Sequence, residues 1–355
     1  MCVGVNGNNS LSKSELGDES LPLVFALHGF GGSIKTMMHW ETVAEEFSFV
    51  LVIPQGIEKS WNAGYCCGYA LKNKLMDTLF LEEIILSLND ELGFVSKNFT
   101  YAVGFSNGAF MITRAAHLFR SIAPISGYQY DLNHLAIDRH PVGLFMHHAI
   151  DDPTVRYEGC CTNRSMPGCC CGISTHSNVC TSATSAFHRW ADLLNNCSGG
   201  DELTFSDNER GITCRTAVGS CRANTTLCTH NDGGHFNGNF ERKFMMKKDI
   251  GHFFARDICE VHHGWWSYDE KKCQCRKTHK GLYCAITETS QHNSLIKIVD
   301  EHSIETSYGI WIIIFGIAIF LLHNFSTKFR GGFNGCRMGG ILARINPRSD
   351  PKTSL

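Results

Sequence analysis

The chain lacks a surplus of charge of either sign. Its 32 lysines and arginines nearly balance its 34 aspartates and glutamates, and the first 300 residues contain no basic block. DNA, RNA and anionic surfaces are bound by such blocks, so no nucleic acid is expected as a partner. Signs of disorder are also lacking, because 43% of the 355 residues are hydrophobic and 11% are aromatic, enough for a sizeable core.

The first 22 residues lack the apolar run that a secretory signal peptide carries. Cysteine content and the charges near the C-terminus both indicate an extracellular protein. We therefore expect that the signal peptide is missing from this sequence, through an incomplete N-terminus or an internal start.

Cysteine, by contrast, is abundant, with 18 residues. Most are clustered, which in an oxidising compartment predicts a disulfide framework. Leaving out Cys2 and Cys336 gives an even number, sixteen, that can pair completely. Residues 159–181 form a cysteine-rich insertion, which we interpret as a disulfide-stapled surface loop, with a thiolate metal cluster as the alternative. Glycosylation sequons, each a weak signal alone, begin at Asn98, Asn163, Asn196 and Asn224.

An uncharged apolar segment near the C-terminus predicts one transmembrane helix over residues 307–325. The alternative is a buried core helix. Acidic residues precede the segment and basic residues follow it, so the positive-inside rule predicts a cytoplasmic basic tail over 326–355. A linker over 287–306 then connects the membrane segment to an extracellular bulk, as in a single-pass protein of the cell membrane.

Short apolar runs alternate with helical patterns through the first half of the chain. This alternation predicts an α/β fold with a mostly parallel sheet covered on both faces. The expected strands are Leu23–Leu27, Phe49–Ile53, Tyr101–Val103, Ile122–Ile125 and Val142–Met146. The expected helices include Leu79–Leu88, Ala109–Ala116 and Ala183–Leu194.

The pentapeptide Gly104-Phe105-Ser106-Asn107-Gly108 lies between an expected strand and an expected helix. The pattern Gly-X-Ser-X-Gly in that position is typical of a nucleophile elbow, in which a strained turn exposes the serine hydroxyl. The glycines are needed because a side chain at either position would collide with the neighbouring strand or helix. Ser106 is therefore the candidate nucleophile, and a merely structural turn is the alternative.

A serine hydroxyl needs an imidazole to accept its proton and a carboxylate to hold that imidazole. In a hydrolase sheet these groups follow in the order serine, acid, histidine. Asp152, just beyond an expected strand, and His235, after a Gly-Gly turn, satisfy that order. Residue pattern alone leaves other candidates open, namely Asp151, His230 and His252.

The developing oxyanion also needs donors. Backbone N–H groups of Asn107 and of the glycine-rich loop after His28, at Phe30, are the candidates. Losing one such donor typically costs about 3 kcal/mol of transition-state stabilisation. A plain glycine turn is the alternative for the loop.

Residues 258–286 form a separate cysteine-containing module. Its ending, Cys273-X-Cys275 followed by Gly281 and Cys284, resembles an EGF-like domain. The resemblance implies that Cys259 pairs with Cys273 and Cys275 with Cys284, the first and third cysteines of such a domain being absent. A zinc ribbon is the competing interpretation.

Five motifs in the same order resemble the secreted esterases of the polyhydroxybutyrate depolymerase and type-B feruloyl esterase family. They are Leu27–Ser33, Trp61–Gly68, Val103–Gly108, His148 with Asp152–Tyr157, and Gly233–His235. The resemblance implies an α/β-hydrolase domain over 22–257, ester hydrolysis through an acyl-enzyme, and neither metal nor cofactor. It assigns Ser106 as nucleophile, Asp152 rather than Asp151 as acid, and His235 as base. His28, Trp61 and Asn62 are expected in the substrate pocket.

Three features depart from that family. The family has further strands before Leu23, for which this chain has no room; Phe236-Asn237-Gly238 replaces an aromatic residue and proline after His235; and the cysteine-rich insertion has no counterpart. The leading hypothesis is a cell-surface serine esterase acting on small or polymeric feruloyl, polyhydroxyalkanoate or other acyl esters. The alternative is a hydrolase-fold binding or adhesion protein with weak or no activity.

Overall fold

The computed structural model describes residues 2–4, 21–64, 66–92, 95–128, 140–159, 182–235 and 240–287. Predictions for the cysteine cluster at 160–181, the linker at 288–306, the membrane helix at 307–325 and the tail at 326–355 lie outside these residues. Within them, no helix is both long and apolar enough to cross a membrane.

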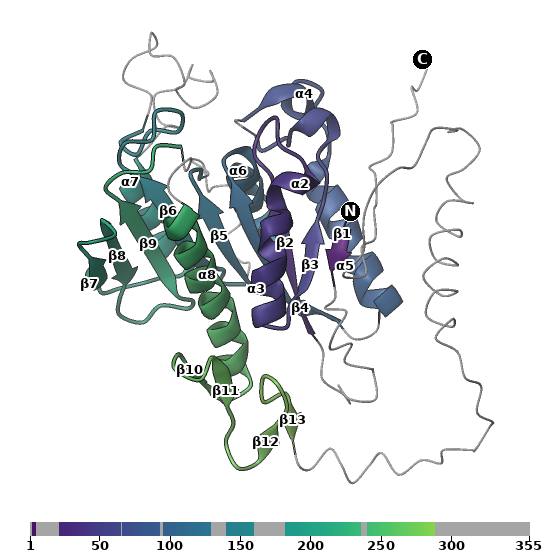
Figure 1. The fold of residues 1–355 in the computed structure, drawn as a ribbon, viewed down its shortest axis with the longest axis vertical. Helices are drawn as coiled ribbons and strands as arrows, with labels where there is room; N and C mark the ends of the chain where they lie inside the picture. The colour runs from purple at the N-terminus through teal and green to yellow at the C-terminus, as the bar shows by residue number, and fades with distance from the viewer. Residues whose placement is uncertain are drawn as a thin grey trace, which may run out of the picture.

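A nine-stranded sheet forms the centre of the molecule, in the order β1-β3-β2-β4-β5-β6-β9-β8-β7 (Figure 1). Its strands are β1 (Cys2–Gly4), β2 (Leu21–Leu27), β3 (Val50–Ile53), β4 (Val95–Phe105), β5 (Ser121–Ile125), β6 (Gly143–Ala149), β7 (Asp201–Asp207), β8 (Ile212–Ala217) and β9 (Thr225–His230). The run from β3 to β9 is parallel, while β1, β8 and β7 pair antiparallel at the two edges. The expected mostly parallel α/β sheet is confirmed, but the expectation that there is no room for a strand before Leu23 is wrong, because β1 pairs with β3.

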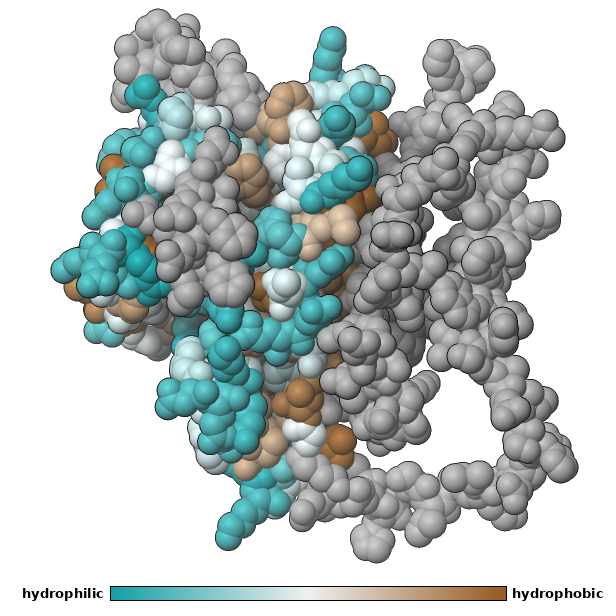
Figure 2. Space-filling model, viewed as in Figure 1, coloured by the Kyte–Doolittle hydropathy of each residue, from teal (hydrophilic) through white to brown (hydrophobic). Residues whose placement is uncertain are grey.

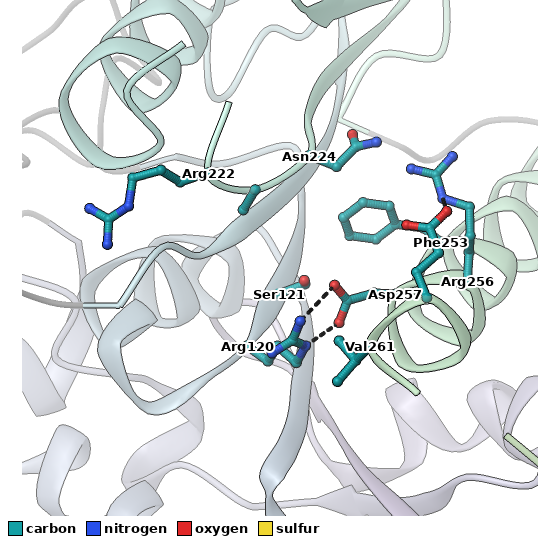
Figure 3. Close-up of a pocket in the computed structure, with 10 residues that line it drawn as sticks. Arg120, Ser121, Arg222, Asn224, Phe253, Arg256, Asp257 and Val261 are labelled. Atoms are coloured by element: carbon teal, nitrogen blue, oxygen red, sulfur yellow. Dashed lines mark hydrogen bonds and ion pairs between the residues drawn. The ribbon is translucent and has the colours of Figure 1, made fainter. Parts of the chain in front are cut away.

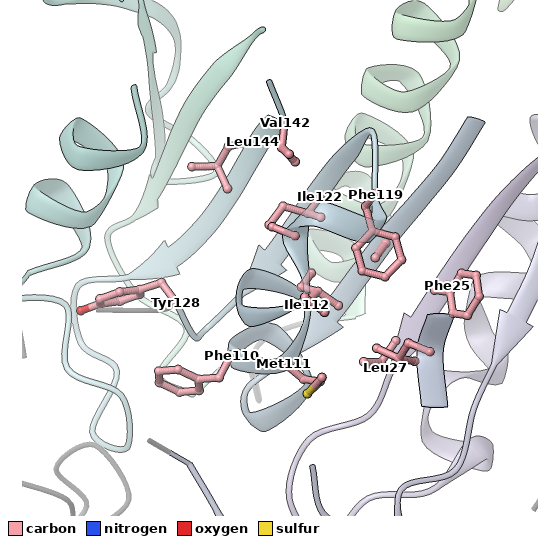
Figure 4. Packing of buried hydrophobic residues seen from close by; sticks show 14 of the residues in the cluster. Phe25, Leu27, Phe110, Met111, Ile112, Phe119, Ile122, Tyr128, Val142 and Leu144 are labelled. Carbon is pink, nitrogen blue, oxygen red and sulfur yellow. The ribbon is translucent and has the colours of Figure 1, made fainter. Parts of the chain in front are cut away.

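Helices cover both faces of this sheet, as the alternating pattern predicted (Figure 1). They are α2 (Ile34–Met37), α3 (Glu41–Glu46), α4 (Gly68–Lys72), α5 (Asp77–Leu92), α6 (Asn107–Arg114), α7 (Ala183–Arg189) and α8 (Phe240–Val261). Short helical turns are η1 (Met38–Trp40), η2 (Ile57–Lys59), η3 (Ala116–Leu118) and η5 (Trp190–Leu194). One buried cluster joins the sheet to α5, α6 and α7 (Figure 4). A second joins its other face to α3 and α8.

The central strands are continuous apolar runs because both of their faces are buried. All seven residues of β2 and all five of β5 are buried. The edge strand β7 is mostly exposed, with Leu203 and Phe205 facing outward. Because β7 has a mixed composition, the β7–β8 hairpin was not predicted from the sequence. The helix α8 was not predicted either, because its first residues are polar.

The helix α8 continues past residue 257, where we expected the hydrolase domain to end, to Val261. Cys259 therefore belongs to α8, and its disulfide to Cys273 joins the helix to the following module. The second disulfide joins Cys275 to Cys284, so both pairs are those that the resemblance implied. The sulfurs of Cys259, Cys273 and Cys284 lie within 4.8 Å of one another. Each of the three cysteines is in a disulfide, so none of them is available as a thiolate ligand for zinc.

The module consists of two small hairpins, β10 (Trp265–Ser267) with β11 (Lys272–Gln274) and β12 (His279–Lys280) with β13 (Ile286–Thr287). The indole nitrogen of Trp266 donates to His252 Nδ1 on α8 at 2.9 Å, and the hydroxyl of Tyr283 donates to the carbonyl of Phe47. These contacts pack the module against the main domain.

Three further disulfides join Cys197 to Cys221, Cys214 to Cys228 and Cys66 to Cys67. The Cys214–Cys228 bond links β8 to β9. Ten cysteines are thus paired within the described residues, as expected for a protein with a disulfide framework.

The face seen in Figure 2 is mostly hydrophilic where residues are coloured, with apolar residues scattered among polar ones. Scattered exposed apolar residues are usual on folded proteins. This face of the described part therefore shows no single broad apolar patch.

The carboxyl of Asp249 on α8 is partly buried, and this burial raises its pKa to about 6, while Arg210 opposes the rise. A carboxyl whose pKa is higher in the folded than in the unfolded state stabilises the fold only where it is protonated. The contribution is complete below the ordinary pKa of 3.8 and is lost as the pH rises through about 6.

We expect Asp249→Asn to raise the free energy of unfolding at pH 7.5 by about 1 to 2 kcal/mol, because the full shift corresponds to about 3 kcal/mol and partial exposure screens it. Urea unfolding at pH 7.5 and 4.0 measures the effect, which should largely vanish at pH 4.0. The exposed Asp192 provides the control variant, Asp192→Asn. An equal gain at both pH values would contradict the linkage.

Candidate active site

Ser106 lies on the sharp turn between β4 and α6, with backbone angles φ 53° and ψ −116°. A positive φ is strained for any residue except glycine, and such strain is typical of functional turns. A Cβ built on Gly104 would lie 2.4 Å from the carbonyl oxygen of Gly108, and one built on Gly108 would lie 2.3 Å from that of Leu27. Both glycines thus allow close backbone approach around the serine.

The imidazole of His235 lies between Ser106 and Asp152. Its Nε2 is 2.8 Å from Ser106 Oγ, and its Nδ1 is 2.9 Å and 3.1 Å from the two carboxylate oxygens of Asp152. The structure therefore brings together three residues from the loops after β4, β6 and β9. With Nδ1 donating to the carboxylate, Nε2 is free to accept the serine proton.

Asp152 is buried, with 3% of its surface exposed. Its Oδ1 accepts hydrogen bonds from the backbone N–H groups of Thr154 and Val155, both at 2.8 Å. The fully buried His148 donates from Nε2 to the carbonyl of Val155 at 2.6 Å, and its burial lowers its pKa. These contacts hold the carboxylate toward the imidazole.

Asp151, the rival acid, has a different position. Its carboxylate is exposed and accepts hydrogen bonds from the backbone N–H groups of Gly234 at 2.8 Å and Gly233 at 3.3 Å. The two rival histidines are also engaged elsewhere: His230 Nε2 lies 3.1 Å from His147 Nδ1, and His252 accepts from Trp266.

The loop after β2 passes close to the serine. A Cβ on Gly29 would lie 3.2 Å from Ser106 Cβ and 3.0 Å from the ring of Phe105. The N–H of Gly31 donates to the carbonyl of Lys59, and that of Gly32 to the carbonyl of Gly29. Phe30, the expected oxyanion donor of this loop, follows Gly29, and its side chain is 60% exposed.

His28 is fully buried, so its ring cannot contact a substrate in this conformation. Its Nδ1 donates to the carbonyl of Gly29 at 2.8 Å, and its Nε2 accepts from the N–H of Gly56 at 3.0 Å and from the side-chain amide of Gln55 at 3.1 Å. Burial lowers the pKa of His28, and the hydrogen bond to Gly29 opposes this. The neutral ring thereby braces the loop beside the serine instead of lining a pocket.

Trp61 and Asn62, also expected in the pocket, are hydrogen-bonded to the protein. Trp61 is fully buried; its backbone N–H donates to Asn107 Oδ1 at 2.7 Å and its indole N–H to the carbonyl of His28 at 2.9 Å. Asn62 Oδ1 accepts from Arg114 at 2.9 Å, and its backbone N–H donates to Asp77. Trp61 is thus tied to the start of α6, and Asn62 is tied to the last residue of α6 and the first of α5.

Sequence reasoning did not identify the supporting roles of Gln55, Asp77 and Arg114. None belongs to a motif, and each reaches its partner across at least 15 residues of chain. Only Asp151 carried a usable signal, because it adjoins the candidate acid.

A cavity of about 270 Å³ lies where strands β5 and β9 begin (Figure 3). This is the end of the sheet opposite to the one at which Ser106, Asp152 and His235 follow their strands. There Asp257 on α8 accepts hydrogen bonds from Arg120 Nε at 2.5 Å and from the buried Tyr101 hydroxyl at 2.8 Å. These bonds fasten α8 to the sheet. Because Ser106 follows the other end of β4, this cavity is separate from the candidate active site.

No protein-family model matches the sequence, and a search of curated proteins finds no match. Among solved structures, the chain is similar to a thermostable esterase at 22% identity and a TM-score of 0.29, over 40% of this chain and 41% of that one. It thus spans less than half the length of that esterase.

An acetyl xylan esterase from Aspergillus awamori is 13% identical with a TM-score of 0.40, over 66% of this chain and 91% of that one. The poly(3-hydroxybutyrate) depolymerase LpqC from Bordetella parapertussis is 12% identical with a TM-score of 0.29, over 38% and 57%.

Gly108 lies too close to the backbone at the end of β2 to accommodate a side chain. In a helix, glycine to alanine ordinarily stabilises by about 1 kcal/mol, but here the added methyl meets backbone oxygens of Leu27 and His28. We expect Gly108→Ala to destabilise the protein by about 2 to 3 kcal/mol, as overpacking does. Urea unfolding measures it.

Gly200→Ala is the control, because nothing lies within 4 Å of its added Cβ although its φ is +77°. It should cost only about 1 kcal/mol, from the left-handed conformation. A Gly108→Ala variant as stable as the parent would contradict the packing of the turn.

Proposed function

We propose that this protein is a serine hydrolase of carboxylic esters that acts through an acyl-enzyme. The observation that carries the proposal is the position of the His235 ring, which is hydrogen-bonded to Ser106 Oγ on one side and to Asp152 on the other. A serine, an imidazole and a buried carboxylate in this sequence of contacts is the arrangement that activates a hydroxyl nucleophile.

In the proposed reaction, His235 Nε2 accepts the hydroxyl proton as Ser106 Oγ attacks the ester carbonyl carbon. The same nitrogen then donates that proton to the leaving alcohol as the tetrahedral intermediate collapses to the acyl-enzyme. Water, deprotonated by His235, attacks the acyl carbon, and the proton returns to Ser106 Oγ as the acid is released. Asp152 keeps Nδ1 protonated throughout and stabilises the imidazolium.

The backbone N–H groups of Asn107 and Phe30 are the proposed oxyanion donors. Asn107 is the first residue of α6, so its N–H lies at a helix N-terminus, where backbone donors and the helix dipole favour negative charge. Its buried side chain holds the backbone of Trp61 through Oδ1 at 2.7 Å and Nδ2 at 3.0 Å. The close passage of Gly29 beside Ser106 supports Phe30 as the second donor.

The substrate class and location form part of the proposal. Feruloyl, polyhydroxyalkanoate or other acyl esters are the proposed substrates, at the surface of a cell whose membrane the chain enters through residues 307–325. Five disulfides within the described residues support an oxidising compartment, since such bonds are rare in the cytosol. The EGF-like identity of residues 258–286 rests on cysteine spacing and on the two disulfides formed there.

We expect Ser106→Ala to lower kcat/KM for a p-nitrophenyl short-chain ester by about 1,000-fold or more, because the nucleophile is removed. Asp152→Asn should lower kcat by about 100- to 10,000-fold, because the imidazole loses the group that sets its tautomer. Steady-state kinetics on the full chain measures both.

Ser126→Ala is the matched control. Ser126 follows the neighbouring strand β5, has a positive φ of 51°, and its buried hydroxyl has no hydrogen-bond partner among the described residues. It should keep the parent activity. Hydrolysis that survives Ser106→Ala would remove this mechanism, and a folded parent protein without activity would favour the binding or adhesion protein.

A further inference from the structure

Two adjacent carboxylates after β6 hold different parts of the same loop. Asp152 is hydrogen-bonded to the ring of His235, whereas Asp151 accepts hydrogen bonds from the backbone N–H groups of Gly233 and Gly234. The second contact is made to the turn that delivers His235 to the serine.

The turn itself is built from two consecutive glycines. Gly233 and Gly234 have φ values of 137° and 55°, a region that glycine enters without strain and in which its backbone freedom is largest. The nearest atoms to an added Cβ are 3.8 Å away at Ala149 for Gly233 and 4.0 Å away at Pro153 for Gly234. Among the described residues no atom lies closer than 3.8 Å to either added Cβ, and ordering a glycine backbone costs about 1 to 2 kcal/mol per residue.

The geometry points to Asp151 as a positioning residue of the active site. Its carboxylate clamps the Gly-Gly turn, so that the ring of His235 stands between Ser106 and Asp152 before substrate arrives. This inference rests on the proposed function, and it assigns Asp151 no contact with the reacting atoms.

A carboxylate suits this task because it offers two acceptor oxygens to two N–H groups, and its charge strengthens both bonds. An asparagine keeps one oxygen, for Gly234, but turns a donor toward Gly233. An alanine keeps neither. Because Asp151 is exposed, solvent weakens its contribution to overall stability, yet a displacement of about 1 Å in a catalytic group lowers rates about 100-fold.

The test compares Asp151→Ala, Asp151→Asn and the control Glu158→Ala, which removes another exposed acid nearby. We expect kcat to fall about 10- to 100-fold in Asp151→Ala with KM changed less than about threefold, because the ring is misplaced and ester binding is not. Asp151→Asn should lie between this variant and the parent, and Glu158→Ala should match the parent.

Hydrogen exchange supplies a readout that does not need activity. In Asp151→Ala, peptides covering residues 231–235 should exchange faster while peptides from β4 and α6 and the Tm stay unchanged. Parent-like kcat and exchange in Asp151→Ala would overturn the inference, and so would a general loss of protection with a lower Tm. If the parent hydrolyses no ester, the proposed function fails, and the clamp is judged by the exchange at 231–235 alone.

Discussion

The hydrogen bonds of one imidazole join three parts of the chain that are far apart in sequence. His235 contacts Ser106, 129 residues away, and Asp152, 83 residues away. The contact is possible because β4, β6 and β9 are parallel, so the loops that follow them leave the sheet at the same end, the carboxyl ends of the strands. The chemistry that we propose depends on this convergence, and much of the structure around it holds the convergent groups still.

The supporting structure consists largely of backbone contacts. Gly104 and Gly108 let β2, β4 and α6 approach so closely around the serine turn that a Cβ at either position would lie within 2.5 Å of a backbone oxygen. Buried polar side chains complete the frame: His28 braces the loop after β2, and Asn107 fastens the Trp61 loop to the start of α6. Two adjacent aspartates then hold His235: Asp152 is hydrogen-bonded to its ring, and Asp151 to the backbone of the turn that precedes it.

The parts of this arrangement with local signals could be predicted from sequence. Continuous apolar runs identified the central strands because both faces of those strands are buried, and the Gly-X-Ser-X-Gly pattern placed Ser106 on a turn. The hairpin of β7 and β8 was not predicted, because an exposed edge strand has no strong apolar pattern. His28 and Trp61 were expected to line the pocket, yet both are buried, because sequence proximity to the site does not reveal which way a side chain points.

The central claim is that His235 activates Ser106, and labelling of the intact protein with a fluorophosphonate tests it most directly. The account predicts one covalent adduct that maps to Ser106 in the parent protein, and a labelling rate that collapses in His235→Ala while the fold is kept. A folded parent that remains unlabelled, or labelling that proceeds as fast without the imidazole, would contradict it.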